Sequence, residues 1–80
     1  MRLRVDLTGA QLIRALGRCG YEVSRQTGSH VRLATSTPTQ HHITVPLHDP
    51  LRIGTLAAIL ADVATAQKLP RDELLQMLFG

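Results

Sequence analysis

Three short runs of alternating polar and apolar residues occupy the middle of this chain of 80 residues. The first run is Tyr21–Arg25, the second alternates around Val31 and Leu33, and the third alternates around Ile43 and Val45. A β-strand sends successive side chains to opposite faces, so each run has one apolar and one polar face. The pattern predicts a three-stranded antiparallel sheet that is buried on one face and open on the other.

A helix is predicted before these strands. Thr8-Gly9-Ala10-Gln11 matches a capping box, in which the first and last residues bond each other's backbone amides. Leu7 and Leu12 occupy the two positions of a hydrophobic staple around it. Gly20 is expected to end this segment in the left-handed conformation, and Cys19 before it is expected to be a small buried hydrophobe rather than a nucleophile.

Two more helices are predicted after the strands. An apolar stripe in Ile53–Ala64 includes Ile53, Leu56, Ala57, Leu60, Val63 and Ala64. Thr65–Leu69 is predicted to be a connector, and Pro70 suits the first position of a last helix with Asp72 and Glu73 in its first turn. The predicted fold class is therefore α+β, with the order helix, three antiparallel strands, helix, helix, in a single domain over residues 1–80.

The turn between the first two strands is predicted from the requirement that apolar residues share a face. A two-residue Thr27-Gly28 turn would set Val23 against Arg32. A three-residue loop ending at Gly28 avoids this arrangement. It predicts the opposite pairs Val23 with Val31, Tyr21 with Leu33, Glu22 with Arg32, and Ser24 with His30.

The remaining segments have less pattern. Arg2–Val5 is compatible with a short edge strand or with a frayed end. Thr35–Gln40 is expected to be an exposed loop, and Leu47–Leu51 is expected to be irregular because Pro46 and Pro50 bracket it.

Composition and charge narrow the function classes. The net charge of +3 favours a polyanionic partner, and the presence of only two aromatic residues, Tyr21 and Phe79, disfavours a base-stacking platform. A single cysteine excludes an internal disulfide and fits a reducing compartment. The charged start of the chain lacks the apolar run of a signal peptide, and Ile53–Ala64 is too short to span a bilayer. We expect a cytoplasmic protein without a membrane segment.

The polar face of the predicted sheet concentrates the residues with useful chemistry. They are Ser24, His30, Arg32, His42 and Thr44 on the face, and Arg25, Ser29, His48 and Arg52 around its edges. RNA transesterification needs a base that takes a proton from the 2′-hydroxyl and cations that stabilise the growing charge on phosphorus. A histidine beside arginines supplies both, since its ordinary pKa lies near neutrality.

Each candidate also has an ordinary structural interpretation. A histidine on a strand is most often a surface residue, and the start of the helix after Arg52 is a weak indication of phosphate binding. His41 and His42 are adjacent, so a strand sends them to opposite faces. A metal site built from His42, His48 and Asp49 lacks a recognised ligand spacing, and we predict no metal and no cofactor.

Several ordered motifs resemble one family. They are Gly20-Tyr21, Arg25-Gln26-Thr27-Gly28-Ser29-His30, Ile43-Thr44-Val45-Pro46-Leu47-His48, and Gly54-Thr55-Leu56 with Ile59-Leu60. From about Thr8 to the C-terminus, the chain resembles the HicA toxins, also called the YcfA-like family. The resemblance implies a fold like that of double-stranded-RNA-binding domains, ribosome-independent mRNA cleavage, and neutralisation by a HicB antitoxin that covers the active face. It also implies that His30, in the Gly-Ser-His motif, is the catalytic residue.

The resulting hypothesis is a metal-independent endoribonuclease, monomeric when free, in which His30 is catalytic. Its substrate-binding residues are Arg25, Ser29, Arg32, His48 and Arg52, and either His42 or His48 is a candidate second proton-transfer group. One alternative is a non-catalytic RNA-binding module on the same fold, although Lys68 is the only lysine and no basic cluster opens a helix. Another is an inactive remnant that still binds its antitoxin.

Overall fold

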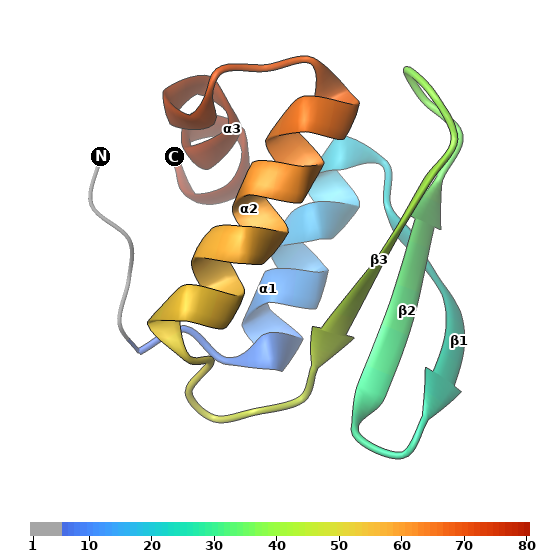
Figure 1. Cartoon of the computed structure of the whole chain (residues 1–80), viewed down its shortest axis with the longest axis vertical. Helices are drawn as coiled ribbons and strands as arrows, with labels where there is room; N and C mark the ends of the chain where they lie inside the picture. Colours follow the sequence, from blue (N-terminus) through green and yellow to red (C-terminus); the bar gives the residue numbers. More distant parts are fainter. Residues whose placement is uncertain (1–5) are drawn as a thin grey trace.

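The computed structural model describes residues 6–80, which form an α+β fold (Figure 1). The order of helix, three antiparallel strands and two helices confirms the predicted fold class. The predicted strand or frayed end at Arg2–Val5 lies outside the described residues. The elements are α1 (Gly9–Leu16), the 3-10 turn η1 (Gly17–Cys19), β1 (Glu22–Thr27), β2 (His30–Thr35), β3 (His41–Pro46), α2 (Ile53–Gln67) and α3 (Arg71–Phe79).

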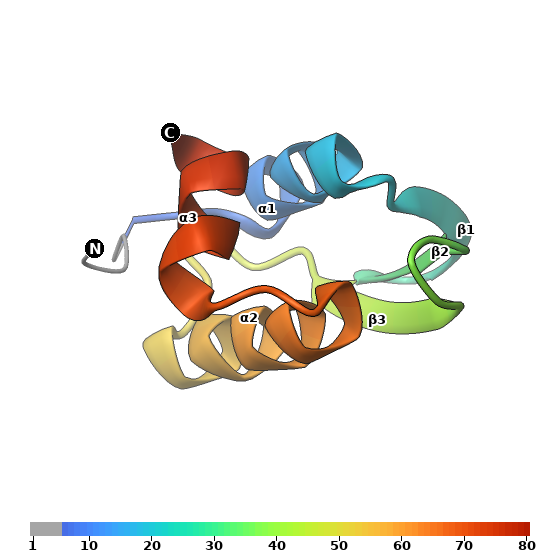
Figure 2. The same cartoon turned by 90° about the horizontal axis from the view of Figure 1, so that it is seen from above.

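The helices cover one face of the sheet. The strands lie in the order β1-β2-β3, and Figure 2 shows all three helices on the same side of them. α1 and α2 pack against β3, and α3 packs against α1 and α2. The apolar residues of β2 and β3 are directed to the helices and the opposite face of the sheet is open, as the alternation predicts. The largest fully buried side chains are Leu7, Leu12, Leu16, Leu33, Leu56, Leu60, Leu74, Leu75, Leu78, Val45 and Val63.

The start of α1 is confirmed as a capping box. The Gln11 backbone N–H donates to the Thr8 hydroxyl at 3.1 Å, and the Thr8 N–H donates to the Gln11 side-chain oxygen at 3.0 Å. These bonds satisfy two amides that the first helical turn would otherwise leave without partners. Gly20 ends the segment in the left-handed region at φ 88°, and Cys19 is buried, both as predicted.

The C-terminal helices differ from the prediction at three points. α2 continues through Gln67, so Thr65–Gln67 is helical rather than a connector. Lys68 ends the helix in the left-handed conformation, at φ 58°, where no glycine signals the stop. Pro70 is the extended residue before α3 instead of its first helical residue, while Asp72 and Glu73 lie in the first turn as expected.

Two residues of the predicted apolar stripe are not buried, because Ala57 is only half-buried and Ile53 is exposed. Ile53 is 44% exposed because α2 begins at some distance from the strands (Figure 1). Ile59, which the predicted stripe did not include, is buried in the core.

The predicted register of the first two strands is wrong. The turn consists of two residues, Gly28 and Ser29, and Gly28 has the positive φ of 58° that the first position of such a hairpin turn requires. All four predicted pairs are replaced. The observed pairs are Thr27 with His30, Gln26 with Val31, Arg25 with Arg32, Val23 with Leu33, and Glu22 with Ala34.

A β-bulge at Ser24 then changes the pairing of the first half of β1. Without it, the two-residue turn would set Val23 opposite Ala34 and turn its side chain toward the open face. The extra residue shifts the register between Val23 and Arg25, so that Val23 lies opposite Leu33 instead. Val23 is nevertheless 56% exposed, contrary to the prediction that it is buried, because β1 is an edge strand beyond the packed helices.

Segment 47–51 is neither helix nor strand, as its prolines predict. Its backbone forms hydrogen bonds to several parts of the fold. The Gly9 N–H donates to the His48 carbonyl at 2.9 Å, which holds the start of α1 against this segment. A Cβ atom at position 9 would collide with the Pro46 carbonyl oxygen. No helix among residues 6–80 is long and apolar enough to cross a membrane.

Replacing Gly9 with alanine is therefore expected to destabilise the fold by roughly 1–3 kcal/mol, because the backbone of Pro46 must move. Gly17→Ala is the matched control, since a Cβ there meets no atom within 4 Å and alanine favours a helical backbone. Chemical denaturation of both variants measures the difference. Equal stabilities of the two variants would contradict the close packing at Gly9.

Candidate active site

The open face of the sheet is organised in three rows, because residues directly opposite in antiparallel strands point to the same side. The row nearest the β1–β2 turn contains His30, the middle row contains two arginines, and the third contains Glu22. Across β1, β2 and β3, the rows are Thr27, His30 and Pro46; Arg25, Arg32 and Thr44; and Glu22, Ala34 and His42.

A pocket of about 200 Å³ lies over the first two rows. Its lining residues, which come from all three strands, are Arg25, Thr27, His30, Arg32 and Thr44. All five are exposed, so the imidazole and both guanidinium groups are accessible to a ligand on the open face.

The two-residue turn sets Arg25 directly opposite Arg32, and the bulge at Ser24 comes immediately before this pair along β1. The Ser24 hydroxyl donates to the Arg32 carbonyl oxygen at 3.2 Å, which ties the bulged residue to β2. The sequence pattern predicts Arg25 at the edge of the face and Ser24 opposite His30, whereas Thr27 lies opposite His30 in the structure. A bulge commonly redirects a side chain next to a functional site.

The arginines face each other without a compensating acid. Neither Arg25 nor Arg32 forms an ion pair within the described part of the chain. Like charges directly opposite on a sheet destabilise it, so the fold retains an unfavourable interaction here. Two such guanidinium groups attract an anion and match the geometry of phosphate oxygens.

The other predicted substrate-binding residues do not line this pocket. The Ser29 carbonyl accepts a bond from the Leu47 N–H at 2.7 Å, within the hairpin turn next to His30. His48 lies in the segment after β3, and Arg52 precedes α2 without a side-chain bond to its first turn. Thr27, predicted only as a turn residue, does line the pocket. The signal for its place on β1 is Gly28, since a two-residue turn that begins at this glycine leaves Thr27 in the strand.

The adjacent histidines lie on opposite faces, as predicted. His42 is exposed in the third row of the open face, whereas His41 is directed toward α2. The Tyr21 hydroxyl lies 2.8 Å from Nδ1 of His41, and Nε2 of His41 lies 3.1 Å from the Asp62 carboxylate. Burial raises the pKa of the Tyr21 hydroxyl. His41 therefore has a structural environment that links β3 to α2.

No set of three His, Cys, Asp or Glu side chains within residues 6–80 is arranged to hold a metal ion. The lone thiol is also a poor candidate for chemistry, because burial of Cys19 raises its pKa and lowers the fraction of thiolate. Among the residues that line the pocket over the sheet, His30 is the one with an imidazole.

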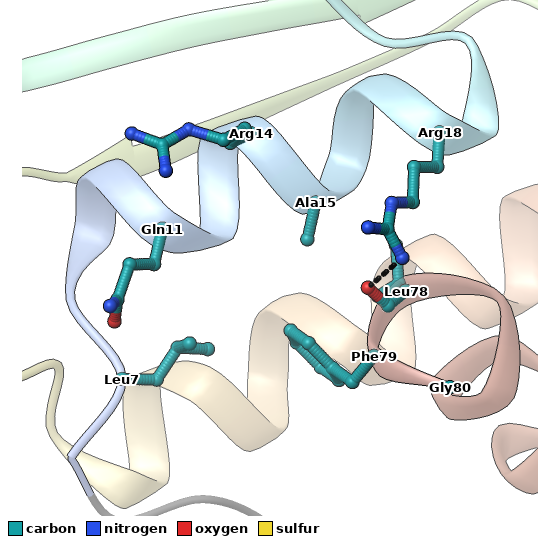
Figure 3. A pocket seen from close by; sticks show the side chains of 8 residues that line it. All are labelled: Leu7, Gln11, Arg14, Ala15, Arg18, Leu78, Phe79 and Gly80. Atoms are coloured by element: carbon teal, nitrogen blue, oxygen red, sulfur yellow. Dashed lines mark hydrogen bonds between the residues drawn. The ribbon is translucent and has the colours of Figure 1, made fainter.

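A separate pocket of about 280 Å³ lies between α1 and α3 (Figure 3). Arg18 crosses it to donate to the Leu78 carbonyl oxygen at 3.3 Å. The lining includes no histidine, cysteine or carboxylate side chain: it consists of Leu7, Gln11, Arg14, Ala15, Arg18, Leu78, Phe79 and Gly80.

Comparison with known proteins identifies the family. The model of the HicA toxin of bacterial toxin–antitoxin systems matches residues 9–64, which is more than half of the chain and includes the whole sheet. No match is found among curated proteins or among solved structures. With its sheet, its Gly-Ser-His turn and this match, the chain belongs to the HicA toxin family.

Proposed function

We propose that this chain is an mRNA-cleaving endoribonuclease of a toxin–antitoxin system, in which His30 is the catalytic residue and no metal takes part. HicA toxins are in general mRNA-cleaving toxins. The observation that carries the proposal is the pocket on the open face, where His30 lies beside the opposed pair Arg25 and Arg32.

The proposed reaction is a transesterification. His30 takes the proton of a 2′-hydroxyl, whose oxygen attacks the adjacent phosphorus. The bond to the 5′-oxygen of the next nucleotide breaks, leaving a 2′,3′-cyclic phosphate and a 5′-hydroxyl that takes up a proton. Arg25 and Arg32 stabilise the charge on the non-bridging oxygens during this step.

The second proton transfer needs a donor. Protonated His30 returns its proton to the leaving oxygen, or a water molecule, His42 or His48 supplies one. RNA beyond the pocket is proposed to contact three exposed residues. Ser29 lies in the turn between β1 and β2, and His48 and Arg52 lie in the segment between β3 and α2.

The second candidate function is an RNA-binding module without catalysis. It is favoured by one observation, which is that the pocket lining contains a single imidazole and no acidic side chain. Binding to RNA without cleavage would identify this function.

Family membership implies a cognate antitoxin. We propose that it is a HicB protein that covers the His30 face, that the free toxin is a monomer, and that both act in the cytoplasm. The opposed arginines favour an antitoxin surface rich in carboxylates.

Replacing His30 with alanine is expected to lower the cleavage rate of a long single-stranded mRNA by at least about 100-fold, since it removes the proton-transfer group. EDTA is expected to leave wild-type cleavage unchanged. Gel analysis of the fragments measures both, and circular dichroism verifies that the variant is folded. Equal cleavage by the two proteins would assign catalysis to another residue.

Replacing Arg25 or Arg32 with alanine is expected to weaken RNA cleavage about tenfold while raising fold stability by roughly 0.2–1 kcal/mol, because each substitution relieves the repulsion between the arginines. Arg71→Ala removes the same charge at the start of α3, away from the sheet. Denaturation and cleavage are measured on all three variants. Loss of stability together with activity would indicate a structural role instead.

Charge reversal at either position, Arg25→Glu or Arg32→Glu, is expected to weaken binding to the antitoxin more than tenfold. Arg71→Glu is the control for net charge. Binding is measured by calorimetry with the purified partner. An antitoxin complex that leaves His30 exposed, or that tolerates both reversals, would rule out occlusion of this face.

A further inference from the structure

A third pocket lies at the other end of the sheet from the hairpin turn. Its volume is about 330 Å³. Glu22 and Ala34 contribute to it from the third row of the open face, and the loop between β2 and β3 forms much of the remaining wall. Gly20, before β1, and Thr35, at the end of β2, complete it. The lining residues are Gly20, Glu22, Ala34, Thr35, Ser36, Thr37 and Gln40.

Hydrogen bonds hold the loop that forms this wall. The Thr37 carbonyl oxygen accepts from the Thr35 hydroxyl at 3.3 Å and from the Gln67 side-chain amide at 3.1 Å. The second bond connects the loop to the last turn of α2. The wall is therefore held in place before a ligand arrives, which lowers the entropy that binding must overcome.

The polar groups of the pocket are available to a ligand. Glu22 is exposed and forms no ion pair within the described residues. The side chains of Ser36 and Gln40 likewise form no hydrogen bond within residues 6–80. Ala34, opposite Glu22, is small and leaves the carboxylate accessible from the open face. The pocket thus offers an acceptor pair with neutral donors beside it.

This chemistry suits a nucleobase rather than a phosphate. A carboxylate repels phosphate and accepts hydrogen bonds through both oxygens. Guanine alone presents two adjacent N–H donors, N1 and N2, on its Watson–Crick edge, with the acceptor O6 beside them. Adenine and cytosine would each direct an acceptor at the carboxylate, and uracil has a single N–H between two carbonyl groups. Single-stranded RNA is commonly read on these edges.

The distance to the catalytic pocket suits one RNA strand that occupies both sites. Ala34 follows His30 by four residues along β2, which corresponds to about 13 Å. Both residues point to the open face, and the arginine row lies between them. A short stretch of single-stranded RNA therefore reaches from one pocket to the other across two cationic side chains.

We propose that the Glu22 pocket binds a guanine base close to the cleaved phosphate and so determines a sequence preference of the toxin. This proposal rests on the proposed function, because it assumes that the protein binds and cleaves RNA at the His30 pocket. Glu22 accepts bonds from N1–H and N2–H of the base, and Ser36 and Gln40 donate toward O6. Aromatic side chains contribute nothing here, because the pocket lining contains none.

The first test uses binding, so that it does not depend on cleavage. The His30→Ala variant, with and without Glu22→Gln, is titrated with short single-stranded RNAs that carry one guanine or one inosine at the same position. Inosine lacks the N2 amino group and is otherwise the same base. We expect inosine to weaken binding by roughly tenfold when Glu22 is present and by less than twofold in the Glu22→Gln protein.

The second test maps the cleavage sites of the wild-type protein on a random-sequence RNA pool. We expect guanine to be enriched at one position near the cut, and the enrichment to fall by roughly tenfold in Glu22→Gln. Glu73→Gln makes the same charge change at the start of α3 and is expected to retain the wild-type pattern.

The outcomes separate the two proposals. Discrimination of inosine without any cleavage would support the guanine site and overturn the nuclease. Cleavage with no guanine preference, or with a preference that Glu22→Gln leaves intact, would overturn the guanine site and leave the nuclease standing. Failure to bind RNA at all would overturn both.

Discussion

Three backbone hydrogen bonds hold segment 47–51 against the rest of the fold. They connect it to the hairpin turn, to the start of α1 and to the residues before α1. Because Ser29 precedes His30, the bond at the hairpin turn also fixes the His30 end of the sheet relative to the helices. Buried or packed backbone groups need such partners wherever the chain is neither helix nor strand. The donor–acceptor pairs are Leu47 to Ser29 at 2.7 Å, Gly9 to His48 at 2.9 Å, and Leu51 to Leu7 at 2.8 Å.

The open face follows from how few elements the chain has. Three helices of this size cover one side of the sheet, so the other side remains polar. On that side the opposed pair Arg25 and Arg32 is unfavourable for folding and favourable for binding an anion. Functional sites often retain interactions that lower stability in this way. A polyanionic ligand, whether RNA or an acidic antitoxin surface, would relieve the repulsion.

The two pockets of the open face differ in charge. The His30 pocket is cationic and suits phosphate, whereas the Glu22 pocket carries one carboxylate among neutral donors. A chain with only two aromatic residues has little means of stacking bases, so hydrogen bonding to base edges is the available form of recognition. Separate sites for chemistry and for reading would let a small toxin select where it cuts.

The sequence by itself determined the order of elements, the capping box at Thr8, the left-handed stop at Gly20 and the faces of β2 and β3, because each depends on residues close together in the chain. It also placed His30 and Arg32 on one face, with Arg25 at the edge of that face. Only the tertiary structure decided the two-residue turn and the bulge at Ser24. The bulge shifts by one residue the register that the turn sets, so different combinations of turn and bulge fit the same alternation of polar and apolar residues. For the same reason, the direct opposition of the two arginines and the pocket at Glu22 emerge only when all three strands are paired and the loop after β2 is tied to α2.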